Sequence, residues 1–301
     1  MAQAKPVKPL DHRHTGPYDR PVFQEQFTAL FAKSSGYNAA AMPDMLKLLT
    51  QIEQDTTITD IRWAAYMLAT VMWETTSPSN FSHVVVDKKG KPVLGKKGEP
   101  VIVTQRKWLM TMAPVDEIGH GKGRKYHEPV KVKLLADGSV RVTEQDGDQF
   151  SVSAGGTYKP LTKDAEMGTQ DGGTAAKVYN DDDGAEQAFF GRGYVQLTWW
   201  SNYAASGAAI GHGLDLLLDP ELVKQPAVAY ALMSHGMRTG KGFANGHKFD
   251  EYFTPTLTNF AGARHMVNGS DHATDIATSA VKFEAILRKA SKPVVAVAPL
   301  P

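Results

Sequence analysis

Gly-Arg-Gly-Tyr-Val-Gln-Leu-Thr-Trp-Trp-Ser-Asn-Tyr, residues 191–203, is the stretch on which the interpretation of this chain depends. Two glycines flank Arg192, and Gln, Thr and Asn side chains then alternate with aromatic rings. Sugar-binding surfaces need this mixture, because aromatic rings stack on sugar faces while amides and hydroxyls bond to sugar hydroxyls. The glycines allow a close approach of the backbone. An aromatic core strand followed by a turn is the alternative, and the stretch alone does not separate the two.

The composition of the whole chain excludes several classes of protein. The 301 residues include 33 Lys and Arg, 32 Asp and Glu, and no cysteine. The lack of cysteine excludes a disulfide scaffold, a thiolate metal site and a cysteine nucleophile. A formal charge of +1 argues against a nucleic-acid partner. No apolar run approaches the roughly 18–20 residues of a transmembrane segment. The histidines lack the spacing of a metal-binding motif, so we expect no metal and no cofactor.

Helical periodicity marks the first and last thirds of the chain, so the body is expected to be mainly α. One helix, with Thr59 as its N-cap, is predicted to end at Trp73 and Glu74. The last helix is predicted to start near Asp271. The apolar stripes of these two helices are Ile61, Ala65, Leu68 and Met72, and Ile276, Ala280, Phe283 and Leu287. No internal repeat is apparent, and we expect one domain at 21–290 between an extended arm at 1–20 and a tail at 291–301.

Two β-rich insertions, at about 80–107 and 129–175, interrupt the helical pattern. Each contains β-branched runs around glycine turns, and Asp137-Gly138 is a strong hairpin signal in the second. Charge is segregated between them, because residues 87–133 hold 12 Lys and Arg against 5 Asp and Glu, whereas 134–190 hold 4 against 11. Solvated hairpin surfaces explain this pattern, and a basic collar that holds an anionic polymer is the alternative.

A single carboxylate, Glu74, is the first candidate for acid chemistry. It lies at the end of an apolar helix beside Trp73, where poor solvation would raise its pKa and suit it to act as a general acid. A surface glutamate at a helix end is the more common case when this feature is taken alone. Asn268-Gly269, before the last helix, is by itself an ordinary turn.

The combination of four motifs is more specific than any one of them. They are Trp-Glu-Thr-Thr at 73–76, Pro-Val-Asp-Glu-Ile-Gly-His-Gly-Lys-Gly at 114–123, Phe-Phe followed by the stretch 191–203, and Ala-Arg-His-Met-Val-Asn-Gly-Ser-Asp at 263–271. In this order they resemble the glycoside hydrolase family 19 chitinases and the related lysozyme-like phage endolysins. The resemblance covers roughly 60–78, 108–128 and 188–288. It implies a lysozyme-like, two-lobed α+β domain, mainly α, in which the β-hairpins are insertions.

The resemblance also implies a role for individual residues in cleaving β-1,4 bonds next to N-acetylated sugars with inversion. Glu74 matches the proton-donating glutamate, although Trp73 replaces the usual histidine. Thr198 matches the hydroxyl that helps to hold the attacking water. The residues implied in binding the sugar chain are Gln196, Asn202, Asn268, Tyr194, Trp199 and Arg192, of which Arg192 has the more structural position.

The second carboxylate of such a mechanism falls in the motif at 114–123. Inverting hydrolysis needs a base roughly 6.5–9.5 Å from the acid, which leaves room for a water. Glu117 is the first choice and Asp116 the second. The arginine that the family carries in its final helix is replaced here by Ala280, so we expect one buried charge network to be absent.

Three functions remain open. The leading hypothesis is an endolysin-type glycosidase that cuts peptidoglycan, and the second is a chitinase acting on N-acetylglucosamine polymers. The third is a non-catalytic, glycan-binding module of a phage particle. A toxin with an immunity protein would share the first chemistry. Because residues 1–21 lack the apolar segment of a secretory signal, we expect synthesis in the cytoplasm and action on the bacterial cell wall.

Overall fold

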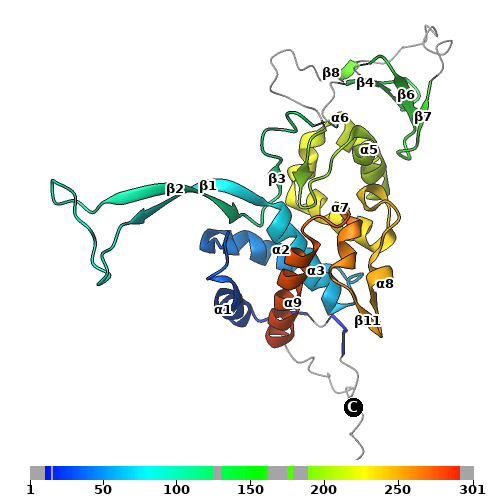
Figure 1. Ribbon diagram of the computed structural model, residues 1–301. Helices are drawn as coiled ribbons and strands as arrows, with labels where there is room; N and C mark the ends of the chain where they lie inside the picture. Colours follow the sequence, from blue (N-terminus) through cyan, green and yellow to red (C-terminus); the bar gives the residue numbers. More distant parts are fainter. Residues whose placement is uncertain are drawn as a thin grey trace, which may run out of the picture.

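Figure 1 shows the computed structural model of the chain, which describes residues 11–14, 16–124, 126, 130–144, 146–161, 175–178 and 189–291. Residues 1–10 of the expected arm, 162–174 of the second insertion and 292–301 of the expected tail lie outside the described residues. Within the described ranges, every helix is too short or too polar to cross a membrane.

One group of helices forms around α3 and α9. Asp60 caps α3 by accepting a hydrogen bond from the backbone N–H of Arg62 at 2.8 Å. The N-cap is therefore Asp60 and not Thr59, because the Asp60 carboxylate also binds the guanidinium of Arg62. The apolar faces of α3 and α9 pack against each other, and α1 packs on α9. The group consists of α1 (Arg20–Phe31), η1 (Ala39–Ala41), α2 (Met42–Gln54), α3 (Ile61–Glu74) and α9 (Ala273–Ala290).

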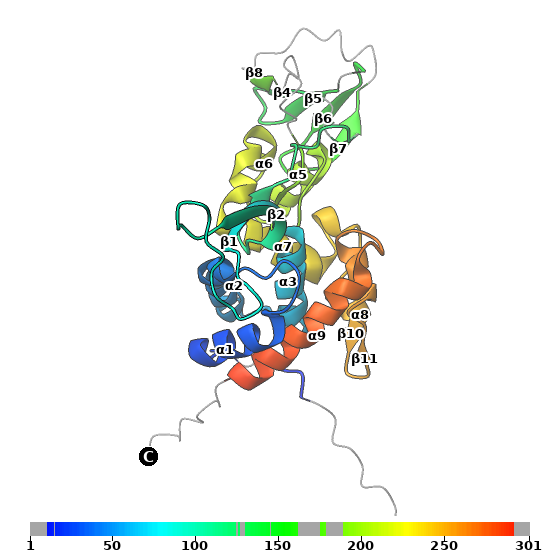
Figure 2. The same ribbon diagram turned by 60° about the vertical axis from the view of Figure 1, so that its left-hand side comes forward.

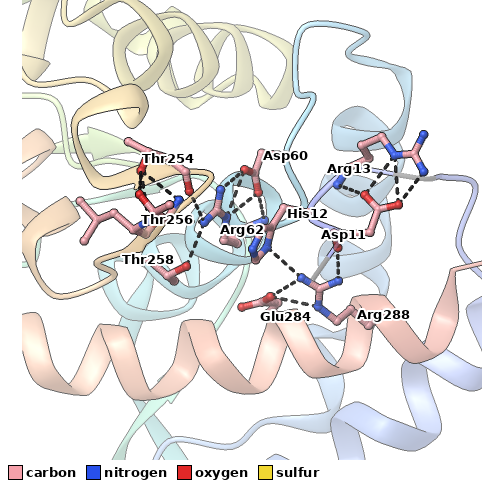
Figure 3. Close-up of polar contacts among 11 residues, drawn as sticks. Asp11, His12, Arg13, Asp60, Arg62, Thr254, Thr256, Thr258, Glu284 and Arg288 are labelled. Atoms are coloured by element: carbon pink, nitrogen blue, oxygen red, sulfur yellow. Dashed lines mark hydrogen bonds and ion pairs between the residues drawn. The ribbon is translucent and has the colours of Figure 1, made fainter. Parts of the chain in front are cut away.

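The described end of the N-terminal arm is attached to this helical group (Figure 3). Arg288 on α9 donates to the carbonyl oxygen of Asp11 at 2.6 Å and approaches His12 Nδ1 at 3.1 Å. The backbone of His14 donates to the Thr59 carbonyl at 2.8 Å. Nearby, the buried Arg62 donates through Nη1 to the carbonyl oxygen of Thr254 at 3.0 Å. Residues 11–14 thus run across the junction of α3 and α9.

A second group of helices follows the stretch 191–203. Asp219 caps η3, and Gly240 ends α7 in a left-handed conformation with φ of 75°. The group consists of α5 (Trp200–Ala209), α6 (Asp215–Leu218), η3 (Pro220–Lys224), α7 (Pro226–Thr239), η4 (Gly242–Ala244), α8 (Phe249–Tyr252) and η5 (Gly262–Met266), with the short ladder β10 (Phe253–Thr254) and β11 (Leu257–Thr258). Because α7 contacts α2, one hydrophobic core continues from the first group into the second.

The first insertion is a long antiparallel hairpin of β1 (Thr76–Val84) and β2 (Ile102–Met110). The hairpin leaves the body directly after α3 and projects away from it (Figures 1 and 2). It starts and ends a few residues outside the expected 80–107, since Thr76 already pairs with Met110.

The second insertion is a sheet of five strands in the order β7-β6-β5-β4-β8. These are β4 (Lys131–Leu134), β5 (Val140–Thr143), β6 (Gln149–Val152), β7 (Tyr158–Pro160) and β8 (Ala175–Val178). The predicted turn at Asp137-Gly138 joins β4 to β5. The sheet packs on α5, because Trp200 donates to Glu144 at 2.7 Å and its ring lies 5.1 Å from that of Phe150. The expectation of a mainly α, α+β fold with inserted β-hairpins is confirmed.

Candidate active site

Glu74 is the last residue of α3, and its side chain is only 13 % exposed. Its Oε1 atom accepts a hydrogen bond from Nη1 of Arg264, which is itself almost completely buried. Burial raises the pKa of the Glu74 carboxyl above its ordinary value, because a low-dielectric environment disfavours the charged form. The positive charge of Arg264 opposes this effect without cancelling it. Glu74 therefore keeps its proton to a higher pH than a solvated glutamate.

Glu74 has a buried arginine partner although position 280, where an arginine was expected to be missing, is alanine. Ala280 is indeed an apolar core residue of α9. The arginine comes instead from η5, where the Nε atom of Arg264 donates to the carbonyl oxygen of Asp271 at 2.9 Å. The backbone of Asn268 donates to the Arg264 carbonyl at 3.0 Å, so the motif 263–271 folds around this guanidinium. Its role could have been inferred from an arginine preceding an otherwise ordinary Asn-Gly turn.

Trp73 packs on the residue that precedes α9. Its ring lies 4.4 Å from the ring of His272. Trp73 is thus in contact with the same η5–α9 junction that supplies Arg264.

Glu117 is held by the glycine-rich stretch. The two-residue strands β3 (Val115–Asp116) and β9 (Arg192–Gly193) pair antiparallel, and the ladder ends in a reciprocal contact. The N–H of Glu117 donates to the Gly191 carbonyl at 2.7 Å, and the N–H of Gly191 donates to Glu117 Oε2 at 3.1 Å. A Cβ atom on Gly191 would lie 3.0 Å from Gln196 Oε1 and 3.3 Å from Glu117 Oε2. Glycine therefore allows both side chains to approach the backbone closely, and a larger residue would displace them.

The other oxygen of Glu117 faces the loop after β3. Glu117 Oε1 accepts a hydrogen bond from the hydroxyl of Tyr126 and lies 4.0 Å from Nε of Arg124. Burial and the carboxylate raise the pKa of Tyr126, so it donates as a neutral phenol. The ring of Tyr126 meets that of Trp199 edge to face at 6.0 Å. Trp199 is 45 % exposed, so its indole is available to a ligand beside Glu117. No sequence pattern indicated the role of Tyr126.

Asp116 and Arg192 belong to a structural ion network. Lys224 lies 2.8 Å from Asp116, and Arg192 Nε lies 3.6 Å from Asp116 and 3.0 Å from Glu221. The guanidinium of Arg192 stacks 3.6 Å from the centre of the Phe190 ring. Arg192 is therefore buried and fully engaged within the protein, which corrects its assignment to substrate binding.

Tyr194 also needs correction as a sugar platform. It is 2 % exposed and lies in the hydrophobic core, so neither face of its ring can stack on a sugar. Burial raises its pKa above the ordinary tyrosine value. The core alternative for the stretch 191–203 thus holds for Tyr194, whereas Trp199 points outward.

The four remaining candidates occupy different environments. Gln196 is half-buried, and its amide donates to the carbonyl oxygens of Val115 and Gly193. Asn268 is exposed, and Asn202 lies half-buried in the first turn of α5. Thr198 is half-buried, and its hydroxyl contacts no polar partner within the ranges that the structure describes. The Thr198 hydroxyl is therefore available to a water or a ligand.

A short segment joins the two carboxylates. The Thr75 hydroxyl, next to Glu74, accepts a hydrogen bond from the N–H of Met112 at 3.1 Å. Met112 and Glu117 are five positions apart, so their Cα atoms lie within about 18 Å of each other. The end of α3 and the Glu117 loop therefore belong to one region of the molecule. The structure thus brings Glu74 together with Arg264, and Glu117 together with Gln196, Tyr126 and Trp199.

Comparison with known proteins finds the same family that the motifs suggest. The family model for class I chitinases, glycoside hydrolase family 19, matches residues 143–235. An endochitinase of Arabidopsis thaliana is 51% identical over 45 residues, which are 15% of this chain and 16% of that protein. The crystal structure of a bacterial family 19 chitinase aligns over 88% of this chain and 93% of its own, with 20% identity and a TM-score of 0.36. The family match includes Gly191–Tyr203 and lies between Glu117 and Asn268.

Proposed function

The chain is related to glycoside hydrolase family 19 through residues 143–235, and from this premise we propose that it is a glycosidase that cleaves β-1,4 bonds in the glycan strands of peptidoglycan. The observation that carries the proposal is the buried Glu74 carboxyl, whose pKa is raised and whose position is fixed by Arg264. A glycosidic oxygen leaves only when it is protonated, so the reaction needs an acid that is still protonated near neutral pH.

Glu74 is the proposed general acid and Glu117 the proposed general base. An inverting enzyme activates a water with a second carboxylate on the opposite side of the bond. Glu117 fits this role better than Asp116, because Lys224 and Arg192 already neutralise Asp116 within the ion network. Thr198, whose hydroxyl is available for a water, is the proposed partner of Glu117 in orienting the nucleophile.

The sugar chain is proposed to lie against Trp199. Its exposed indole adjoins Tyr126 and, through Tyr126, Glu117, so a sugar stacked on it would sit next to the base. Gln196, Asn202 and Asn268 remain the proposed polar contacts of the chain.

Peptidoglycan is favoured over chitin by the charge beside Glu117. The side chain of Arg124 is 68% exposed and lies at this carboxylate. Chitin is uncharged, whereas the lactyl and peptide groups of peptidoglycan carry carboxylates that a cation attracts. A chitinase acting on N-acetylglucosamine polymers is the alternative. The proposed place of action is accordingly the bacterial cell wall, as for an endolysin.

The test is digestion of purified peptidoglycan by the full chain and by Glu74→Gln, with mass spectrometry of the released fragments. We expect the wild type to release fragments whose reducing-end sugar identifies the bond, and Glu74→Gln to lose at least about a hundredfold in rate. Glu284→Gln, a change to another partly buried glutamate that pairs with Arg288 on α9, is the matched control and should keep the wild-type rate. Release of chitooligosaccharides with no effect on peptidoglycan would favour the chitinase. Binding of either polymer without turnover would show a non-catalytic module.

A further inference from the structure

The far end of the β1–β2 hairpin, residues 84–102, is built from two copies of an eight-residue unit. Residues 87–94 read Asp-Lys-Lys-Gly-Lys-Pro-Val-Leu, and 95–102 read Gly-Lys-Lys-Gly-Glu-Pro-Val-Ile. The expectation that the chain lacks an internal repeat was therefore wrong, because the repeated unit is too short to show as a domain-scale period. We call residues 84–102 the hairpin tip.

Each unit folds into the same closed turn. In the first, the N–H of Asp87 donates to the Lys91 carbonyl at 2.8 Å, and Gly90 has φ of 75°. In the second, the N–H of Gly95 donates to the Glu99 carbonyl at 2.7 Å, and Gly98 has φ of 85°. The two glycines take the left-handed conformation that other residues adopt with strain. The repeated sequence thus encodes a repeated structure.

A ring of three backbone hydrogen bonds joins the units. Val85 donates to Val101, Val101 donates to Val93, and Val93 donates to Val85, each at 2.8 Å. The three valines are spaced by eight residues: Val85 precedes the first unit, and Val93 and Val101 are the seventh residues of the two units. The ring gives the hairpin tip a defined three-sided shape although it has no hydrophobic core of its own.

The residue after each of these valines points outward and is apolar. Val86 is 54%, Leu94 59% and Ile102 63% exposed. These are among the most exposed large apolar side chains in the described part of the protein. All three lie on the hairpin tip, and the hairpin projects from the body as a thin arm (Figures 1 and 2).

The charge of the hairpin tip is strongly positive. It contains two acidic residues, Asp87 and Glu99, and five lysines. Its net charge of +3 exceeds the +1 of the whole chain, so the rest of the molecule is slightly negative. All five lysines are exposed: Lys88, Lys89, Lys91, Lys96 and Lys97.

The chemistry of the hairpin tip identifies the kind of partner. Residues 84–102 contain no aromatic, amide or hydroxyl side chain. A saccharide would therefore find no ring to stack on, and its hydroxyls could bond only to charged side chains. They contain no arginine, tyrosine or tryptophan, the residues that dominate protein interfaces. Aliphatic groups surrounded by lysines match a surface with an apolar interior and an anionic rim, which is the interface of an anionic lipid bilayer.

We propose that the hairpin tip binds the surface of anionic lipid bilayers. Val86, Leu94 and Ile102 enter the boundary between headgroups and acyl chains, while the lysines contact the lipid phosphates. The hairpin emerges directly after α3, so the enzyme body would be held at the membrane through the arm. This inference concerns residues outside the proposed active site and does not depend on the glycosidase activity.

The first test is co-sedimentation of the full chain with vesicles of phosphatidylcholine containing about 30% phosphatidylglycerol. We expect the chain to bind these anionic vesicles and to bind vesicles of pure phosphatidylcholine at least about tenfold more weakly. Binding to the anionic vesicles should weaken as the salt concentration is raised. Replacing Val86, Leu94 and Ile102 together by serine should reduce the partition coefficient at least about tenfold. The matched control replaces three exposed apolar residues elsewhere by serine: Leu30, Leu257 and Val281.

The charge contribution is tested in the same assay. Replacing Lys88, Lys89 and Lys96 by glutamine should weaken binding to the anionic vesicles by at least about fivefold. The control changes three exposed lysines on other surfaces to glutamine: Lys33, Lys159 and Lys241. Both triple variants lose the same charge, so equal losses of binding would overturn the proposal and leave only non-specific attraction.

A site-specific probe tests insertion directly. Because the chain has no cysteine, Leu94→Cys can be labelled uniquely with an environment-sensitive dye. Its emission should shift to the blue on adding the anionic vesicles, whereas the dye at Val281→Cys should not respond. No vesicle binding at low salt, retention on peptidoglycan alone, or self-association blocked by the tip variants would each overturn the proposal. All outcomes can be read in Glu74→Gln, so they are separate from the test of the proposed function.

Discussion

The guanidinium of Arg264 binds the carboxylate of Glu74 although 190 positions separate the two residues in the chain. The contact joins the end of α3 to the motif that precedes α9. Two opposing effects meet at Glu74, since burial raises its pKa and Arg264 lowers it. The net result is a raised pKa, so Glu74 keeps its proton to a higher pH than an ordinary glutamate.

Arg264→Met should move the alkaline limit of glycosidase activity to higher pH. An acid catalyst works while it is protonated, so activity is lost as the pH rises through the pKa of Glu74. Removal of the positive charge leaves the desolvation of Glu74 unopposed and raises this pKa further. The measurement is the rate of reducing-end release from solubilised peptidoglycan as a function of pH.

The controls separate charge from packing. Arg264→Lys keeps the charge and should leave the alkaline limit close to that of the wild type, even if the rate falls. Arg238→Met changes an arginine of α7 that donates to Ser234 and should leave the profile unchanged. A shift of the limit to lower pH in Arg264→Met would contradict the assignment of Glu74 as the acid.

Tyr126→Phe should lower mainly kcat, whereas Trp199→Ala should raise mainly KM. The first keeps the ring and removes the hydrogen bond to Glu117, so kcat should fall about tenfold with little change in KM. The second removes an exposed stacking surface, so KM should rise several-fold with a smaller effect on kcat. Initial rates over a range of substrate concentrations distinguish the two. An unchanged kcat in Tyr126→Phe would mean that the phenol does not position the base.

Gly191→Ala should impair catalysis with little effect on folding. The added methyl would lie 3.0 Å from Gln196 Oε1 and 3.3 Å from Glu117 Oε2, so both side chains must shift. A displacement of this kind in a catalytic group lowers the rate by about tenfold or more. Gly155→Ala is the control, because its Cβ would meet only Ser153 Oγ at 3.8 Å. Equal rates in the two variants would show that Glu117 tolerates displacement.

Gly156→Ala should destabilise the packing of the second insertion on α5. A Cβ at this position would lie 2.7 Å from the carbonyl oxygen of Ala204, and φ is +73°. Gly147→Ala has a similar backbone, with φ of +93°, but open space around the Cβ. Both variants should lose about 1–2 kcal/mol of stability to backbone strain. Gly156→Ala should lose about 1–3 kcal/mol more, because its methyl group overlaps neighbouring atoms. Thermal unfolding measures the difference, and equal midpoints would show that the sheet is not docked there.

Sequence reasoning recovered the parts of the fold that local patterns control. The predicted stripe of α9 is buried, that of α3 is buried except for the half-buried Met72, and the predicted turn at Asp137-Gly138 is present. The N-cap of α3 was misplaced by one residue, because Thr59 and Asp60 are both good caps and only tertiary contacts of Arg62 select Asp60. The eight-residue repeat was missed because its period is far below the roughly 20–50 residues of domain-scale repeats.

The candidate site was harder to derive, since its contacts join distant segments. Periodicity placed Glu74 at a helix end, but nothing in it indicated that Arg264 would pair with Glu74. In the stretch 191–203, the alternation of rings and polar side chains left a sugar-binding surface and an aromatic core strand both open. The strand β9 has only two residues, so Tyr194 turns into the core while Trp199 stays outside.

The adjacent residues Trp199 and Trp200 contact different parts of the molecule. Trp199 faces the region of Glu117, and Trp200 is covered by Phe150 and Tyr158 of the second insertion. A minimal catalytic unit therefore cannot be obtained by simply excising residues 130–178. That deletion would remove the cover of the Trp200 indole, which is adjacent in sequence to the proposed sugar platform. Engineering a smaller enzyme from this scaffold would require a new apolar partner for Trp200.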